Sequence, residues 1–94
     1  MEEAITTFAV DVRITPRAGI LDPVGETIGR ALADLGYDGV GRVHAGRLIS
    51  FRLDAADADT ARSEVTRMCE ELIANPVIED YAIRVEPAAK AGIS

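Results

Sequence analysis

The sequence predicts an α+β fold of the ferredoxin-like type, in the order β-α-β(β)-α-β, with an antiparallel sheet and both helices on one face. Large apolar residues alternate with polar ones near residues 8–15, 48–53 and 81–85, which is the spacing of half-buried strands. Apolar residues at helical spacing follow near residues 24–35 and 61–72. Because 94 residues are enough for one domain only, we expect residues 1–94 to form a single domain.

The first strand is expected at residues 8–15, after an amino-terminal extension at residues 1–7. Every second residue in this strand is a large apolar one, so these side chains share one buried face. They are Phe8, Val10, Val12 and Ile14.

The first helix is expected to begin at Asp22-Pro23, because an aspartate oxygen caps the free amides and proline suits the first helical position. Gly36 accepts the left-handed conformation that ends many helices. The positions between them form one apolar stripe, which is expected to pack on the sheet. The stripe contains Val24, Ile28, Ala31, Leu32 and Leu35.

Residues 37–54 are strand-like in composition and contain a weak turn signal, Ala45-Gly46. A hairpin is favoured slightly over one long bent strand, and both remain open. Leu48, together with Val40 or Val43, is expected on the sheet face that no helix covers. A bare sheet face favours packing against another sheet, so we expect a dimer or a larger assembly.

The second helix is expected to be capped by Asp57 or Asp59 and to stop at Asn75-Pro76, because the residue before a proline avoids the helical region. Its stripe consists of Ala61, Val65, Met68 and Leu72. A last strand carries Tyr81, Ile83 and Val85, and residues 87–94 are expected to form a flexible tail.

Composition excludes several classes of function. The net charge is 10 − 16 = −6, which disfavours nucleic acid and anionic membrane surfaces as partners. No apolar run approaches the roughly 20 residues that span a bilayer. Cys69 is the single cysteine, so no disulfide can form within the chain. We therefore expect a cytoplasmic protein.

No catalytic constellation emerges from the residues. His44 is the sole histidine and Cys69 the sole cysteine, so a two-histidine metal site within one chain is excluded and Cys69 is expected to be a packing thiol. We expect no catalytic residue, no metal site and no cofactor in this chain. A stand-alone enzyme using His44 and Cys69 is the weakest of the alternatives.

Two long motifs carry a resemblance to a known family. They are Gly19-Ile20-Leu21-Asp22-Pro23-Val24-Gly25-Glu26-Thr27-Ile28 and Ala74-Asn75-Pro76-Val77-Ile78-Glu79-Asp80-Tyr81. Neither helix capping nor strand alternation dictates these residue identities. Together with Leu35-Gly36-Tyr37 and Gly46-Arg47, they make the sequence similar to the PurS subunit family of phosphoribosylformylglycinamidine synthase over residues 10–85.

The resemblance implies a small non-catalytic subunit in purine biosynthesis that bridges a glutaminase subunit (PurQ) and an ATP-dependent synthetase subunit (PurL). The complex would use glutamine, ATP and Mg to convert formylglycinamide ribonucleotide into formylglycinamidine ribonucleotide, a C–N ligase reaction in which ammonia passes between active sites. The resemblance also implies self-association to a dimer or tetramer.

The candidate partner contacts are the motif residues that are polar, conformationally special or beside the last strand. They are Asp22, Pro23, Gly25, Arg47, Asn75, Glu79, Asp80 and Tyr81. Three of them, Arg47, Glu79 and Asp80, have no structural role that the sequence reveals. The alternative function is a ferredoxin-like regulatory module of the ACT type, which would bind an amino acid between paired subunits.

Overall fold

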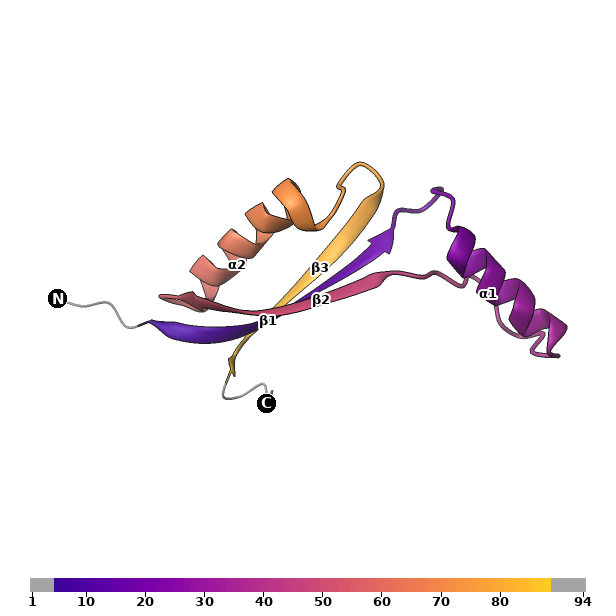
Figure 1. The fold of residues 1–94 in the computed structure, drawn as a ribbon, viewed down its shortest axis with the longest axis horizontal. Helices are drawn as coiled ribbons and strands as arrows, with labels where there is room; N and C mark the ends of the chain where they lie inside the picture. The colour runs from indigo at the N-terminus through magenta and orange to yellow at the C-terminus, as the bar shows by residue number, and fades with distance from the viewer. Residues whose placement is uncertain (1–4, 89–94) are drawn as a thin grey trace.

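The computed structural model describes residues 5–88 and contains a three-stranded antiparallel sheet with one helix on its face and one beyond its end (Figure 1). The strands are β1 (Thr6–Pro16), β2 (Arg47–Ala55) and β3 (Glu79–Pro87) in the spatial order β2-β1-β3. The helices are α1 (Pro23–Asp34), α2 (Ala58–Met68) and a five-residue π-helix, η1 (Cys69–Ile73). The predicted α+β ferredoxin-like class is confirmed.

Strand β1 lies at the centre of the sheet and supplies most of the core. Its residue Val12 faces Ile49 on β2 and Ile83 on β3, so the alternating apolar side chains of all three strands meet on one face. The core consists of Phe8, Val10, Val12, Ile14, Ala55, Ala61, Val65, Cys69 and Ala74, with Phe51, Leu53, Tyr81, Ile83 and Val85 packed against it. The predicted buried face of β1 is confirmed.

Both alternatives for residues 37–54, the hairpin at Ala45-Gly46 and the single long bent strand, are wrong, because residues 37–46 form no strand and β2 begins at Arg47. Gly46 serves a close approach instead. A Cβ atom on Gly46 would lie 2.3 Å from the carbonyl oxygen of Ile14. Any larger residue would therefore push β2 away from the end of β1.

The amino-terminal boundary also differs from the prediction. Thr6 and Thr7, which the sequence placed in the extension, are part of β1 and pair with β2. At the other end, Pro87, which the sequence placed in the tail, is the last residue of β3 and pairs with Phe8. Residues 1–4 of the predicted extension and 89–94 of the predicted tail lie outside the described residues.

Both helices are capped as their sequences predict. Asp22 accepts the amide hydrogen of Gly25 at 2.9 Å, Pro23 occupies the first turn of α1, and Gly36 adopts a φ of 99° just after the helix. For α2 the structure selects Asp57, whose carboxylate accepts the Thr60 amide at 2.7 Å.

Helix α2 packs on β2 and β3, but its apolar stripe departs from the prediction after Met68. The chain changes there to the wider π-helical turn, in which the Ala74 amide bonds the Cys69 carbonyl five residues back. Cys69 is fully buried, whereas Leu72 is 86% exposed. The prediction of Leu72 as a core residue is therefore wrong.

Helix α1 lies beyond the end of the sheet (Figure 1), and among residues 5–88 it has no extensive packing against any strand. The prediction that both helices cover the sheet face of this chain is wrong for α1. The radius of gyration is 17.4 Å, whereas a compact chain of this length has one of about 12 Å. The apolar side of α1 is accordingly exposed, including Val24, Ile28 and Leu35.

Candidate functional site

Most of the candidate contact residues meet at one end of the sheet, where β1 ends and β2 and β3 begin. The register places Pro16 opposite Glu79, and Ile14 opposite Arg47. Asp22, Arg47 and Glu79 line one hollow of about 280 Å³ at this end, together with Ile14, Pro16, Val24, Ala45 and Gly46. Folding therefore brings together motif residues that are far apart in the sequence.

Arg47 and Glu79 form a two-pronged ion pair at the centre of this end. The Arg47 Nη1 atom lies 3.0 Å from Glu79 Oε2, and Nη2 lies 3.3 Å from Oε1. Arg47 Nη2 also donates to the carbonyl oxygen of Ile73 at 3.1 Å. The sequence alone indicated no structural role for either residue. In the structure their bonds connect the start of β2 to the chain before β3.

The charge state of Glu79 is set by its neighbours. Its Oε1 accepts the backbone amide of Asn75 at 2.8 Å. This bond, followed by the hydrogen bond and charge of Arg47, lowers the pKa of Glu79 below its ordinary value. Glu79 is therefore an acceptor that holds its neighbours in place, and is unsuited to donating a proton.

Asp22 joins α1 to the segment that leads into β2. Its side chain is only 11% exposed and accepts the amides of Gly25 at 2.9 Å and Ala45 at 3.0 Å. These two backbone bonds lower the pKa of Asp22, and His44 Nδ1, 3.5 Å away, lowers it further. The predicted surface histidine is exposed and lies beside this carboxylate.

Gly25 is required by the same junction. A Cβ atom at this position would lie 2.4 Å from the carbonyl oxygen of Val43 and 2.6 Å from an Asp22 carboxylate oxygen. Since one of these atoms is backbone, the clash could not be relieved by a rotamer change. The motif therefore needs a glycine here for packing.

Two further candidates, the acidic residue Asp80 and the aromatic residue Tyr81, lie in β3. Asp80 is 3.5 Å from the guanidinium of Arg17, a residue that sequence reasoning missed because nothing in its local pattern distinguishes it. The Tyr81 hydroxyl donates to Glu70 of η1, and this bond raises the pKa of Tyr81 to about 12. Tyr81 packs against the core and is paired with Ile14 of β1, which is also the partner of Arg47 on β2.

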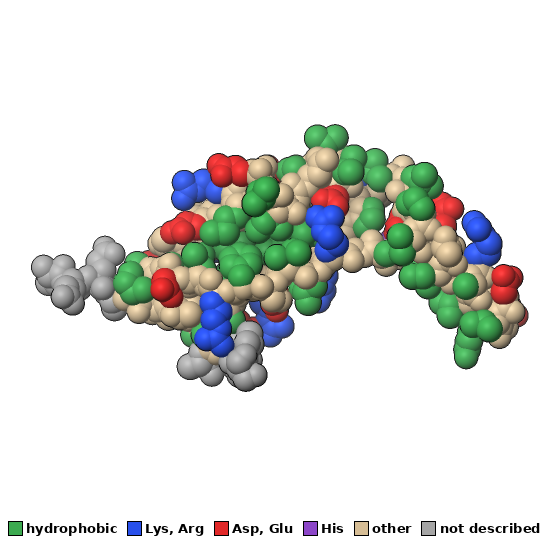
Figure 2. Space-filling model, in the orientation of Figure 1, with side chains coloured by type: hydrophobic (Ala, Val, Ile, Leu, Met, Phe, Trp, Pro, Cys, Tyr) green, Lys and Arg blue, Asp and Glu red, His purple; other side chains and the backbone are tan. Residues whose placement is uncertain are grey.

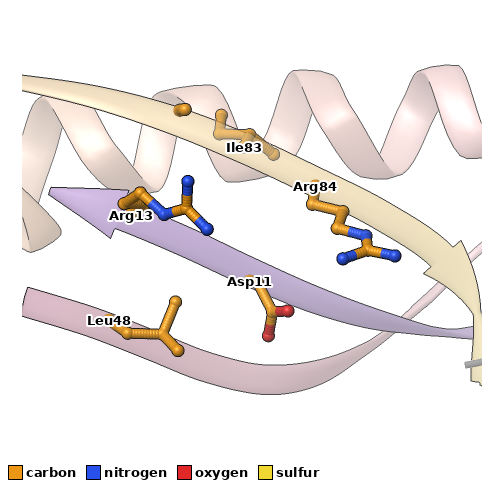
Figure 3. A pocket seen from close by; sticks show the side chains of 6 residues that line it. Asp11, Arg13, Leu48, Ile83 and Arg84 are labelled. Atoms are coloured by element: carbon orange, nitrogen blue, oxygen red, sulfur yellow. The ribbon is translucent and has the colours of Figure 1, made fainter.

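A second hollow, of about 340 Å³, lies on the sheet face that α2 leaves uncovered (Figure 3). It is lined by Asp11, Arg13, Leu48, Ala82, Ile83 and Arg84. Figure 3 shows Asp11 between the two arginines. Leu48 is exposed there as predicted, but its neighbours are mostly charged. This face therefore combines one exposed leucine with three charged side chains.

Two features of the described residues bear on their chemistry. Burial, aided by the charge of Glu70, raises the pKa of the Cys69 thiol, which makes it a poor nucleophile. Within residues 5–88, no group of three or more His, Cys, Asp and Glu side chains lies close enough together to hold a metal ion. No described helix is both long and apolar enough to cross a membrane.

Comparison with known proteins agrees with this architecture. Residues 9–87 match the family PurS, described as phosphoribosylformylglycinamidine (FGAM) synthase. The chain belongs to the PurS family. A PurS subunit of FGAM synthase from Methanocaldococcus jannaschii is 39% identical over 79 residues, which are 84% of this chain and 95% of that protein. A PurS subunit from Synechocystis is 40% identical over 79% of this chain and 74% of its own length.

Solved PurS structures share the fold. The crystal structure of Methanocaldococcus jannaschii PurS superimposes with a TM-score of 0.76 at 39% identity, covering 85% of this chain and 96% of that one. A chain of PurLQS from Thermotoga maritima gives a TM-score of 0.72 at 35% identity over 88% of this chain and 99% of its own. These high coverages show that the PurS likeness extends across nearly all of both chains.

Proposed function

We propose that this chain is the small subunit of an FGAM synthase complex in purine biosynthesis, where it bridges the glutaminase subunit PurQ and the synthetase subunit PurL. The PurS family match over residues 9–87 carries this proposal. The bonds that hold Arg47 and Glu79 at the end of the sheet also support it, because they fix motif residues at the surface. The relatives favour this role over a regulatory module of the ACT type.

In this role the subunit holds the two larger subunits in a fixed relative position. Ammonia released from glutamine exchanges with protons and water, so a bridge that keeps the two active sites aligned protects the nucleophile until it reacts. Glutamine, ATP and Mg belong to the larger subunits in this proposal, and this chain binds none of them. The complex is cytoplasmic, where its nucleotide substrates are made.

Self-association is part of the proposed role. The apolar stripe of α1 does not pack on the sheet within the described chain. A contiguous exposed apolar face favours binding to another protein. A second copy, as part of a dimer or tetramer, can cover this stripe and so complete the two-helix layer that the fold class requires. The larger subunits then dock on other surfaces.

Reconstitution of the enzyme tests the bridging role. Purified PurQ and PurL from the same organism should make FGAM from glutamine only when this chain is added, whereas FGAM formation from added ammonium should proceed without it. The three proteins should also co-elute on gel filtration. Full glutamine-dependent activity without this chain would overturn the proposal.

A further inference from the structure

The sheet face that α2 leaves uncovered has balanced charges, although the chain as a whole is acidic. Strand alternation and the register with β1 place the charged side chains there. Within residues 5–88, and counting the arginine that pairs with Asp80, they are Arg13, Arg17, Arg52, Arg84, Asp11, Asp54, Asp80 and Glu86. In Figure 2, acidic and basic side chains lie together along the lower side of the body, away from α2 in Figure 1. Their balance is 4 − 4 = 0 on a chain of net charge −6, so two copies can approach through this face without net repulsion.

Six of these eight side chains already have partners, namely Arg84 with Glu86, Arg17 with Asp80, and also Asp54 and Arg52. The other two lie at the centre of the face. Arg13 has neither a hydrogen bond nor an ion pair with any residue in the described range 5–88. Asp11 uses one carboxylate oxygen, Oδ1, to accept the Ser50 hydroxyl at 2.7 Å. The face thus presents one guanidinium without a partner and one carboxylate that can accept more bonds.

Arg13 and Asp11 lie on the same side of β1, two residues apart and hence about 7 Å from each other along the strand. Both line the hollow of about 340 Å³ in Figure 3, together with Leu48. Leu48 pairs with Arg13 across the sheet and is 61% exposed, whereas Ser50 pairs with Asp11. A large and a small side chain on β2 therefore accompany the two opposite charges on β1.

A two-fold axis can satisfy both charges at once. In such a contact, a residue that faces a second residue of the other copy is faced by it in return. With the axis across the strands at Val12, Arg13 of each copy faces Asp11 of the other, and Leu48 faces Ser50. Sheets packed face to face lie about 10 Å apart, a gap that an arginine and an aspartate bridge together. With the axis along the strands, Arg13 would face Arg13, which is repulsive.

The remaining charges are compatible with the axis at Val12. On β3, Asp80 of one copy lies opposite Glu86 of the other, because both are equally far from the axis. Each of these carboxylates keeps its own arginine, Arg17 or Arg84, so the two do not meet as bare charges. Past the start of the other copy's β2 lie an arginine and an aspartate, whose charges cancel: Arg52 and Asp54.

The size of this face indicates how strong the contact can be. Its three strands, of nine residues or more, cover about 14 × 30 Å, so packing two such faces together buries about 850 Å². This area is below the roughly 1,200 Å² of a stable interface, so one contact cannot hold two single chains. It can join two dimers that are already linked through α1, because a tetramer of dihedral symmetry contains the contact twice.

We propose that the uncovered sheet face binds the same face of a second copy and thereby joins two α1-linked dimers into a tetramer. Arg13 and Asp11 form the two reciprocal ion pairs, and Leu48 packs on Ser50 of the other copy. This inference rests on the self-association included in the proposed function, and it assigns to the sheet a contact distinct from that of α1.

Exchange of the two charges tests the proposal. Asp11→Arg or Arg13→Asp alone sets like charges against each other twice, so each should raise the dimer–tetramer dissociation constant by about tenfold or more. The double variant exchanges the two residues and should restore the tetramer, because opposite charges face each other again. Light scattering over a concentration series measures the mass, and circular dichroism confirms that each variant is folded. Arg67→Asp, on α2, makes the same change of charge as Arg13→Asp and should remain tetrameric.

Each outcome supports or overturns the sheet contact. Tetramers in both single variants, or a folded double variant that stays dimeric, would overturn it. Monomers in the single variants would overturn it too, because the face would then belong to the α1 contact. A wild-type chain that stops at the dimer would refute the sheet contact and leave α1 and the bridging role intact. A wild-type monomer would instead overturn the self-association on which the inference rests.

Discussion

The pair formed by Arg47 and Glu79 connects two segments that are 32 residues apart in the sequence. Both side chains reach solvent, so their mutual attraction is screened and contributes little by itself. Their contribution is geometric, since the planar guanidinium meets both carboxylate oxygens and the Ile73 carbonyl at once. A lysine in place of Arg47 could not keep all three contacts.

Glu79→Gln should lower the melting temperature at neutral pH and matter less in acid. The folded state lowers the pKa of Glu79 below 4.5, so its stabilising effect is complete above the unfolded pKa and is lost as the pH falls through the folded value. The difference in melting temperature between wild type and variant should therefore shrink between about pH 5 and pH 3. Circular dichroism melts at several pH values measure it.

Comparison of the two proteins at each pH cancels the other acid-sensitive groups. Asp22 and Asp57 also have lowered pKa values, because backbone amides bond their carboxylates, but both are present in wild type and variant. Glu71→Gln is the control at an exposed glutamate of η1. A difference that stays constant from neutral pH to acid would contradict the assigned role of Glu79.

Among the elements, β1 and η1 show what local patterns can and cannot predict. The buried face of β1 followed from alternation alone, because side chains of a strand always alternate between two faces. The π-helical turn was not predictable. A spacing of 3.6 residues per turn assigns Leu72 to the buried stripe, whereas in the structure Cys69 and Ile73 continue that stripe. Tertiary packing overrides the local helical periodicity at this point, and tertiary packing cannot be recognised from the local sequence.

Cys69 should be inert in the folded protein. Its thiol is fully buried against Val65 and the sheet core, and burial raises its pKa. Ellman's reagent should not react with the native chain but should titrate one thiol after unfolding in guanidinium chloride. Cys69→Ser should lower the free energy of unfolding by about 1–3 kcal/mol, because a buried hydroxyl lacks a good partner. Rapid reaction of the native thiol would show that η1 opens readily.

At the scale of the whole molecule, the sheet and α2 form a small packed body from which α1 extends. The molecule measures 63 × 30 × 15 Å. The apolar stripe of α1 was predictable from its helical period. Such a stripe indicates that the helix packs on another apolar surface, but not whether that surface belongs to the same chain. Similarly, the candidate residues were predictable as a motif, whereas their meeting at one sheet end depends on strand register.

Ile28→Lys on α1 should abolish self-association without unfolding the chain. Ile28 is exposed in the described structure, so a lysine is tolerated in the monomer, whereas a charge inside an apolar contact between copies carries a large desolvation cost. Light scattering coupled to gel filtration should show a fall to the monomer mass. Ala33→Lys, on the opposite side of α1, should keep the wild-type mass. An unchanged mass for Ile28→Lys would place the contact elsewhere.

The attachment of α1 has a mechanical consequence. Two stretches of chain lead to and from this helix, and the Asp22 carboxylate ties them together through the amides of Gly25 and Ala45. These two bonds fix how α1 is oriented relative to the chain that leads into β2. The 12 residues of this helix make a lever about 18 Å long, so a tilt of about 10° at Asp22 sweeps the far tip through about 3 Å. The orientation of the exposed apolar stripe of α1 relative to the sheet therefore depends on the contacts of Asp22.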